Sequence, residues 1–444
     1  MVNASLKKVF IKNFKSLHDC EIDIGKLNVV VGANASGKSN LVEAFRLLKK
    51  IYVDKDPFPF LEWWGYDNVV WQRKEELPII IGLLFDIEGY DVYFETNFTG
   101  TGGKFQILRE LLDIKGYLKF EKKGEWTAVK HDMKFIDAVI EKPQKYNVIS
   151  EGKLIISKHK DNLTKEVKIP WGDLPNLLGL IQGFGYNNKY NNIKEKNVAK
   201  ISYEKIDDWE IFAPVVVAHR YKEKEYYGNI YAVSSKRILL TLEKLSVLYP
   251  LNIRLMKNPQ PLRREETIKE DGTNIASVYH TIYLKEGKIP EEIYNPLTMV
   301  FPKIDVRPHL TDDSRIMIKF KEDGFELLPP NTSDGFYKIL TVLVAIYLKP
   351  PLLIIDEIEN SLHPETLELI LDTIKASDVQ AIITTHSPVV VDMTEPDDMI
   401  LVEKERGESR FKRIKDPDKI RTFLKEKGIK FSTGWLYGEI SHIE

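Results

Sequence analysis

The stretch Lys26-Leu-Asn-Val-Val-Val31 runs directly into Gly32-Ala-Asn-Ala-Ser-Gly-Lys-Ser39. The first part is an apolar run of strand character, and the second has the pattern GxxxxGK[ST]. Leu41-Val-Glu-Ala-Phe-Arg-Leu-Leu48 then repeats apolar residues at helical spacing. A strand, a glycine-containing loop and a helix in this order predict a loop that binds a nucleotide through its phosphates.

Each residue type in this loop has a physical reason. Gly32 and Gly37 allow a tight turn in which successive N–H groups point into one concavity, where the next helix also directs its positive end. Lys38 is predicted to reach the β- and γ-phosphates, and the Ser39 hydroxyl is predicted to ligate Mg²⁺.

A second set of motifs lies in the last third of the chain. Ser333-Asp-Gly335 opens a predicted helix, and the apolar stretch Leu352–Glu357 reads as a buried strand that ends in two carboxylates. A helix over Pro364–Ala376 and a strand over Ala381–Thr385, followed by His386, complete a predicted βαβ unit.

These motifs predict catalytic roles. Asp356, at the carboxyl end of its strand, would lie beside the Mg²⁺ held by Ser39. Glu357 would point to the other face of the strand and polarise a water in line with the γ-phosphate. His386 would contact the γ-phosphate as a neutral imidazole and sense the nucleotide state. The plainer alternatives are a strand that ends in solvated acids and a structural histidine.

Composition describes a soluble globular protein. The chain has 444 residues, 43% of them hydrophobic and 29% charged, with a formal net charge of −2. No apolar run is long enough to cross a bilayer and the first residues lack a signal-peptide core, so we expect a cytoplasmic protein without membrane contact. The single cysteine, Cys20, excludes an intrachain disulfide and is expected to be a buried apolar residue.

The two sets of motifs are separated by enough chain for an inserted lobe. Leu77 to Pro170 is β-rich with short connections, which favours antiparallel pairing. Tyr186–Lys205 is expected to be an exposed loop and Lys236–Leu245 a helix. We predict an α/β P-loop NTPase with a mixed sheet and an antiparallel β subdomain, plus an inserted, mainly helical lobe. The predicted domains are residues 1–170 (first half of the ATPase with the β subdomain), 171–300 (inserted lobe) and 301–444 (second half).

Aromatic residues gather just after the first helix. Trp63, Trp64 and Trp71 lie close together within Phe58–Trp71. A buried aromatic cluster under a loop is the preferred interpretation, and a platform on which nucleic-acid bases stack is the alternative.

The order of the motifs resembles the ABC-type ATPase fold shared by SMC and RecF proteins. Ser333-Asp-Gly335 resembles their signature motif, Asn360-Ser-Leu-His-Pro364 their D-loop and His386 their switch histidine. More closely, the chain resembles the OLD-like group of AAA ATPases. Four features carry that closer resemblance: Asn40 directly after Ser39, Asp271-Gly-Thr-Asn-Ile275, Phe301-Pro302 and Gly434-Trp-Leu-Tyr-Gly438.

This resemblance implies ATP and Mg²⁺ as cofactors, with each ATP bound between two copies of the chain. It implies Glu357 and His386 as the catalytic residues, and Ser39 and Asp356 as metal ligands. Gln72 is the candidate for the glutamine that completes the Mg²⁺ shell, and a plain surface glutamine is its alternative. The residues implied to contact ATP are Gly32, Asn34, Gly37, Lys38, Ser39, Asn40, Ser333, Asp334, Gly335 and Ser361.

The sequence also departs from the pattern of the group. Ala35 stands where many ABC-type loops have Gly, and Lys338 stands where this group usually has Arg. OLD-family nucleases continue after the switch histidine into a Toprim domain, whereas 58 residues follow His386 here, so we expect no Toprim nuclease. Glu403–Lys430 holds eleven Lys or Arg and six Asp or Glu, which a solvated helix of mixed charge explains more simply than a nucleic-acid site.

Three functions stay open. The first is an ATP-driven homodimeric switch or motor in a prophage, toxin–antitoxin or anti-phage defence system, which gates a separate effector protein. The second is a RecF-like repair ATPase that contacts DNA directly. The third is a small-molecule kinase, which the Asp-Glu pair and the signature disfavour.

Overall fold

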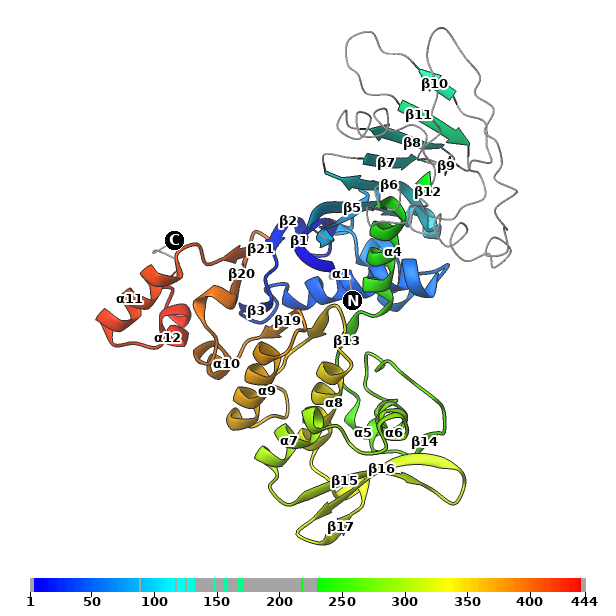
Figure 1. The fold of residues 1–444 in the computed structure, drawn as a ribbon. Helices are drawn as coiled ribbons and strands as arrows, with labels where there is room; N and C mark the ends of the chain where they lie inside the picture. The colour runs from blue at the N-terminus through cyan, green and yellow to red at the C-terminus, as the bar shows by residue number, and fades with distance from the viewer. Residues whose placement is uncertain are drawn as a thin grey trace. The chain divides into compact units, whose positions relative to one another are not determined.

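The computed structural model describes residues 4–87, 89–115, 118–123, 126–131, 147–148, 155–157, 166–170, 217–218 and 230–440. The chain forms two compact units, each with its own β-sheet (Figure 1). Unit 1 comprises Met1–Glu21 and Lys50–Leu242, and unit 2 comprises Ile22–Lys49 and Glu243–Glu444. The predicted loop over residues 186–205 lies outside the described residues.

A nine-stranded sheet dominates unit 1, with the strand order β10-β11-β8-β7-β6-β5-β4-β1-β2. Every pairing from β10 through to β1 is antiparallel, which confirms the pairing predicted for this part of the chain. The strands are β1 (Ala4–Phe14), β2 (Leu17–Asp23), β4 (Ile79–Ile87), β5 (Tyr90–Thr99), β6 (Gln106–Ile114), β7 (Leu118–Lys123), β8 (Trp126–His131), β10 (Ile155–Ser157) and β11 (Glu166–Pro170). A separate pair joins β9 (Asn147–Val148) and β12 (Val217–Ala218).

Strand β5 shows why this region folds as a sheet. Its side chains alternate between buried and partly exposed, so that Val92, Phe94 and Phe98 all face the core. Phe94 meets the ring of Tyr52 edge to face, and Tyr52 belongs to the π-helix η1 (Lys50–Asp54). Cys20 of β2 is buried, as predicted.

The aromatic-rich segment is only partly a buried cluster. Trp71 is 6% exposed and stacks on His18, and Trp63 meets Phe14 edge to face. The prediction is wrong for Trp64, which is 90% exposed and has a left-handed backbone conformation at the end of a 3-10 turn. The 3-10 turns of unit 1 are η2 (Leu61–Trp63), η3 (Tyr66–Asn68), η4 (Trp71–Arg73) and η5 (Thr101–Gly103).

Unit 2 is built on a six-stranded mixed sheet with the order β13-β18-β19-β3-β20-β21. Its pairings are parallel except for the last, between β20 and β21. The strands are β3 (Leu27–Gly32), β13 (Ser246–Leu248), β18 (Leu353–Ile355), β19 (Ala381–Thr385), β20 (Met399–Glu405) and β21 (Glu408–Arg413). Every residue of β3, β18 and β19 is buried, as expected for parallel strands covered on both faces.

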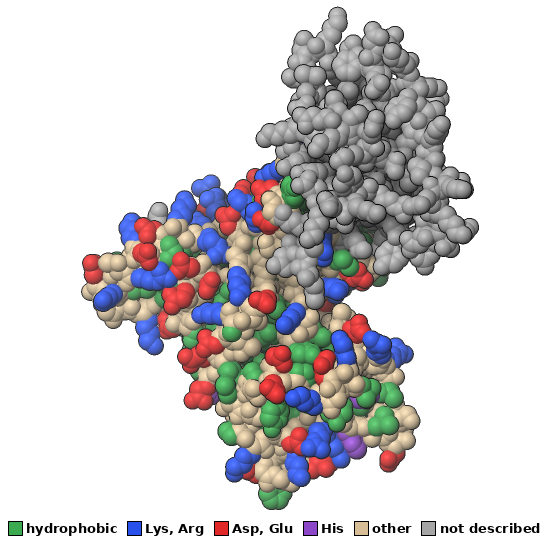
Figure 2. All heavy atoms as spheres, viewed as in Figure 1, with side chains coloured by type: hydrophobic (Ala, Val, Ile, Leu, Met, Phe, Trp, Pro, Cys, Tyr) green, Lys and Arg blue, Asp and Glu red, His purple; other side chains and the backbone are tan. Residues whose placement is uncertain are grey.

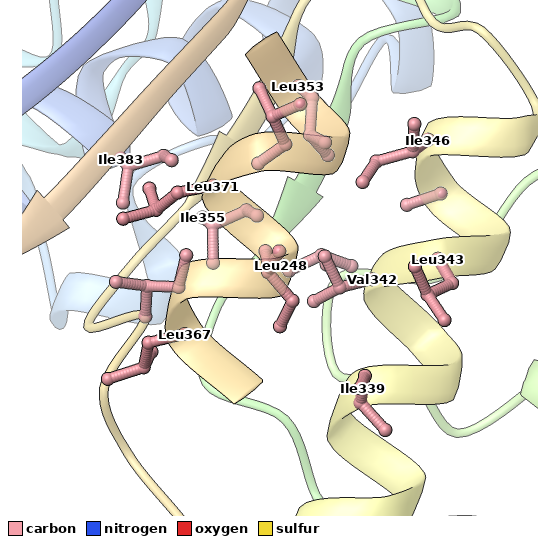
Figure 3. Close-up of a cluster of buried hydrophobic side chains, with 14 of the residues drawn as sticks. Leu248, Ile339, Val342, Leu343, Ile346, Leu353, Ile355, Leu367, Leu371 and Ile383 are labelled. Carbon is pink, nitrogen blue, oxygen red and sulfur yellow. The ribbon is translucent and has the colours of Figure 1, made fainter. Parts of the chain in front are cut away.

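Two helices predicted from the sequence pack on this sheet. Helix α8 (Asp334–Tyr347) and helix α9 (Pro364–Ala376) direct apolar side chains toward strands β18 and β19. Figure 3 shows this layer, in which Leu371 of α9 lies beside Ile355 and Val342 of α8 lies beside Leu248. The β18–α9–β19 unit confirms the predicted βαβ arrangement.

A smaller sheet in unit 2 has the order β14-β16-β15, with β17 paired to β16. Of the predicted lobe, residues 217–218 and 230–300 are described. The longer stretch is mainly helical, and its strand β13 pairs with β18 of the main sheet. None of the described helices is long and apolar enough to span a bilayer. The remaining elements are α1 (Lys38–Lys49), α4 (Ile230–Glu243), α5 (Ile253–Met256), β14 (Gln260–Pro261), α6 (Ile275–Glu286), α7 (Glu291–Val300), β15 (Ile304–Leu310), β16 (Arg315–Glu322), β17 (Phe325–Leu327), η7 (Pro329–Asn331), α10 (Pro388–Asp392), η8 (Pro396–Asp398), α11 (Pro417–Lys427) and α12 (Phe431–Leu436).

Candidate nucleotide-binding site

The loop between β3 and α1 has the backbone that the sequence predicts. A Cβ on Gly32 would lie 2.5 Å from the carbonyl oxygen of Val402 and 2.6 Å from the Ser36 hydroxyl, so only glycine fits. Gly37 has φ +109°, which favours glycine as well. Ala35 has φ +61°, so the residue that replaces the usual glycine occupies a left-handed conformation that an L-residue adopts at a cost.

Lys38 folds back onto its own loop. Its Nζ donates to the carbonyl oxygens of Gly32 (2.7 Å) and Ala33 (2.9 Å). Burial lowers the pKa of Lys38, although the nearby carboxylates, led by Glu359, act to raise it. The ammonium therefore lies among oxygen acceptors at the mouth of the loop, the environment that a phosphate would also supply.

The loop serine and the second predicted metal ligand come together. Ser39 Oγ lies 3.2 and 3.3 Å from the two carboxylate oxygens of Asp356. Thr384 Oγ1 donates to Asp356 Oδ1 at 2.5 Å and accepts from the Glu357 N–H at 2.9 Å. The three strands β3, β18 and β19 thus bring these groups to one edge of the sheet, because parallel strands end on the same side.

The residues at this edge fit Mg²⁺. A hydroxyl and a carboxylate are hard oxygen donors, and a Mg²⁺ bound with ATP needs few protein ligands because phosphates and waters supply the rest. Among the described residues, no group of three or more His, Cys, Asp or Glu is placed to hold a metal ion. Burial raises the pKa of Asp356, while hydrogen bonds from Thr384 and Ser39 lower it.

Glu357 does not lie on the strand as predicted. Strand β18 ends at Ile355, and Glu357 has φ +49°. The direction of the Glu357 side chain is therefore set by a turn and not by the alternation of side chains along a strand. Its carboxylate accepts a hydrogen bond of 2.6 Å from the amide of Asn360. Its backbone carbonyl accepts one of 2.9 Å from Lys338 Nζ.

His386 lies directly after β19 and is held by a residue that the sequence did not single out. Glu359 Oε1 accepts the backbone N–H of His386 at 2.9 Å and lies 2.9 Å from its Nδ1. Within the described residues, the second oxygen of this carboxylate is buried without a hydrogen-bond partner. The His386 side chain is 39% exposed and that of Glu359 12%.

The predicted signature opens helix α8. Ser333 is its N-cap, and its hydroxyl accepts from the Phe336 N–H at 3.3 Å. A Cβ on Gly335 would lie 2.6 Å from the backbone oxygen of Ser361, so glycine permits the start of α8 to touch the D-loop. Ser361 is exposed with φ +62°, and Asp334 is exposed as well.

The remaining predicted site residues lie at different places. Asn34 is exposed on the loop, and the Asn40 N–H donates to the Gly37 carbonyl at the start of α1. Gln72 is an exposed residue of η4 in unit 1 with φ +51°. Its part in a Mg²⁺ shell stays a prediction.

Sequence patterns missed Thr384 and Glu359 as site residues. Thr384 lies within the predicted strand Ala381–Thr385, and Glu359 lies between the predicted strand that ends at Glu357 and the D-loop that begins at Asn360. The sequence does not reveal that Thr384 reaches Asp356 from the neighbouring strand β19, or that Glu359, after the end of β18, reaches His386.

The strand, loop and helix around Lys38, with an aspartate from a second parallel strand beside Ser39, define a P-loop NTPase. A family model described as "AAA ATPase domain" matches residues 5–286, which is more than half of the chain, and the chain belongs to this family. A second model, described as "AAA domain, putative AbiEii toxin, Type IV TA system", matches residues 269–392.

Individual proteins are similar to parts of this chain or to its fold. "Uncharacterized protein MJECL44" of Methanocaldococcus jannaschii is 30% identical over an alignment of 217 residues. The match covers 43% of this chain and 63% of that relative's length, so this chain spans less than two thirds of the relative. The fold is similar to that of an SMC head solved in complex with the C-terminal winged-helix domain of ScpA, with a TM-score of 0.51 and 14% identity over 92% of this chain and 97% of the other. The predicted fold class, a P-loop NTPase of ABC type, is confirmed.

Proposed function

We propose that this protein is a Mg²⁺-dependent ATP hydrolase of the OLD-like group, in which each ATP is bound between two copies of the chain. The observation that carries the proposal is the contact of Ser39 with Asp356 at 3.2 Å, at the mouth of a loop where only glycine fits at position 32. A hydroxyl and a carboxylate so placed are the protein ligands that a Mg²⁺–triphosphate requires.

Lys38 and the loop N–H groups would bind the phosphates, and Ser39 and Asp356 would hold the Mg²⁺, which neutralises charge that develops on the phosphates. The Lys38 ammonium already donates hydrogen bonds to two backbone carbonyl oxygens. On ATP binding it could donate to phosphate oxygens in their place. Thr384 orients Asp356 from behind, as outer partners of metal ligands commonly do.

Glu357 would take a proton from the attacking water. Two hydrogen bonds hold the backbone of Glu357: its N–H donates to Thr384, and its carbonyl oxygen accepts from Lys338. These bonds restrict the positions that the Glu357 carboxylate can take. His386, supported by Glu359, would donate to the γ-phosphate and report whether it is present.

The signature would act across the dimer. Ser333 and Gly335 lie at the amino end of a 14-residue helix, where N–H groups favour an anion. Gly335 lies against the D-loop, and Asn360 of the D-loop donates a hydrogen bond to the Glu357 carboxylate. Through these two contacts, the γ-phosphate of the ATP bound by the partner subunit would influence Glu357. The division at residues 170 and 300 into two ATPase parts and a lobe is part of the same proposal.

Glu357→Gln tests the catalytic part. We expect this variant to bind ATP normally, to lose at least about 10²-fold in kcat, and to accumulate as an ATP-dependent dimer. The measurements are phosphate release and light scattering with and without ATP, over a range of protein concentrations. The exposed Glu365→Gln, on helix α9, is the matched control. Rapid turnover by Glu357→Gln, or a wild-type rate per subunit independent of protein concentration, would overturn the proposal.

The biological role is proposed as a switch that gates a separate effector in a defence or toxin–antitoxin system, in keeping with the second family description. A RecF-like DNA clamp is the alternative. On the face seen in Figure 2, Lys and Arg side chains of unit 2 are interspersed with Asp and Glu, and Arg421 of α11 pairs with Glu395, Asp397 and Asp418. Such neutralised cations favour the switch, and DNA-stimulated hydrolysis with steep salt dependence would favour the clamp.

A further inference from the structure

We propose that Lys257 is a positioning residue for the signature Ser333, and that its effect is felt in the ATP site of the partner subunit. The inference rests on the proposed composite site. Lys257 follows α5, in the segment between β13 and α6, and no motif of the sequence pointed to it.

The ammonium of Lys257 holds the chain on both sides of Ser333. Its Nζ donates to the carbonyl oxygen of Thr332 at 2.6 Å and lies 2.8 Å from Asp334 Oδ1. It also lies 6.0 Å from the ring centroid of Tyr337, one turn further along α8. A single cation thus fixes the residue before and the residue after the signature serine.

The contacts of Lys257 with Asp334 and with Thr332 differ in strength. Asp334 is 59% exposed, so its ion pair with Lys257 is screened by water and weak. Thr332 is 5% exposed and the Lys257 side chain 17%, so the charge-assisted bond to the carbonyl lies in a protected place. This bond fixes the peptide that leads into Ser333.

Lys257 acts from a rigid support. The Asn252 side chain caps α5 by accepting from the Leu255 N–H at 3.1 Å, and the Asn252 N–H donates to the Asp271 carbonyl at 2.8 Å. Met256 is 2% exposed and packs against Gly272, where φ is +71° and a Cβ would lie 3.0 Å from the Met256 sulfur. These contacts fix the backbone next to Lys257 and so restrict the position of its ammonium group.

The same segment also reaches the protein's own P-loop helix. Glu270 accepts from Arg46 Nε of α1 at 2.7 Å, and the Tyr249 hydroxyl donates to Glu43 of α1 at 3.1 Å. In a composite dimer the P-loop and the signature of one subunit serve two different ATP molecules. Lys257 belongs to the signature side, so its loss should affect the site that holds the partner's ATP.

Lys257→Met keeps the apolar stem and removes the ammonium, and the exposed Lys288→Met is the matched control. We expect ATP affinity of the dilute, monomeric protein to change less than twofold. We expect kcat to fall about tenfold, as for loss of one aligned contact in the transition state, and ATP-dependent dimers in a Glu357→Gln background to weaken similarly. Lys288→Met should match the wild type.

Mixing subunits separates this role from a purely structural one. A Lys38→Ala subunit has a defective P-loop and an intact signature. A Lys257→Met subunit has an intact P-loop and a signature whose position is no longer held by Lys257. A mixed dimer then contains one intact composite site, so a one-to-one mixture should recover up to about a quarter of the wild-type rate if dimers form at random. Neither variant alone should reach it.

The outcomes are distinguishable. Failure of Glu357→Gln alone to dimerise with ATP would overturn the proposed function. Dimers of Glu357→Gln that form equally well with Lys257→Met present, or a mixture no more active than the sum of its parts, would overturn the role of Lys257 and leave the proposed function standing.

Discussion

Lys338 stands at a position where the proposed OLD-like group usually has Arg. It is 6% exposed, donates to the Glu357 carbonyl, and burial lowers its pKa to about 8 against the pull of nearby carboxylates, led by Glu359. A guanidinium would stay charged at this place, whereas this ammonium can lose its proton at moderately alkaline pH.

The pKa of Lys338 predicts a pH-dependent stability. An unfolded lysine titrates near 10.5 and the folded one near 8, so between these values the unfolded state binds more protons and the free energy of unfolding rises with pH. Below about pH 8 both states are protonated and the contribution is constant. From pH 7.5 to 10.5, the wild type should gain up to about 3 kcal/mol relative to Lys338→Met in chemical denaturation.

The exposed Lys285→Met, on α6, is the control for removal of a lysine from the same unit. A difference between wild type and Lys338→Met that stays the same across this pH range would contradict the prediction.

At the scale of elements, the decisive contact is that between the start of α8 and the D-loop. Gly335→Ala would improve helix propensity by about 1 kcal/mol, but its Cβ would meet the Ser361 backbone oxygen at 2.6 Å. Backbone cannot yield as a side chain does, so we expect a net loss of about 1–3 kcal/mol in unfolding free energy and a lower kcat.

Gly434→Ala in α12 is the matched control, because its Cβ would meet only the movable side chains of Ile440 and Leu424, at 3.0 to 3.3 Å. It should change stability by less than about 1 kcal/mol. Equal effects of the two substitutions would show that the close approach at Gly335 is unimportant.

At the scale of the whole molecule, one prediction concerns Gln72, a residue of unit 1. Its predicted place in the Mg²⁺ shell requires it to act with residues of unit 2. Gln72→Ala should then raise the Mg²⁺ concentration for half-maximal ATPase activity about tenfold or more, with ATP held constant.

Gln106→Ala, also exposed and in unit 1, is the control and should leave the Mg²⁺ titration unchanged. Identical titrations for the two variants would make Gln72 an ordinary surface residue.

The sequence alone determined the elements whose patterns are local. The run from Lys26 to Ser39 fixed β3, its loop and α1, and the pattern from Pro364 to Thr385 gave α9 and β19 with the predicted bounds. Apolar periodicity and turn residues act over a few positions, so they can be recognised in one chain. The sequence therefore predicted the fold class, and ATP as the nucleotide stays part of the proposed function.

Tertiary structure decided which side chains meet. The contact of Ser39 with Asp356 joins positions 317 residues apart, and it was predicted only because the motifs are familiar. Glu357 lies in a turn after its strand, and Glu359 and Lys257 make contacts that no local pattern marks. Such contacts depend on where a turn directs a side chain and on what the sheet brings beside it, and those are properties of the folded chain.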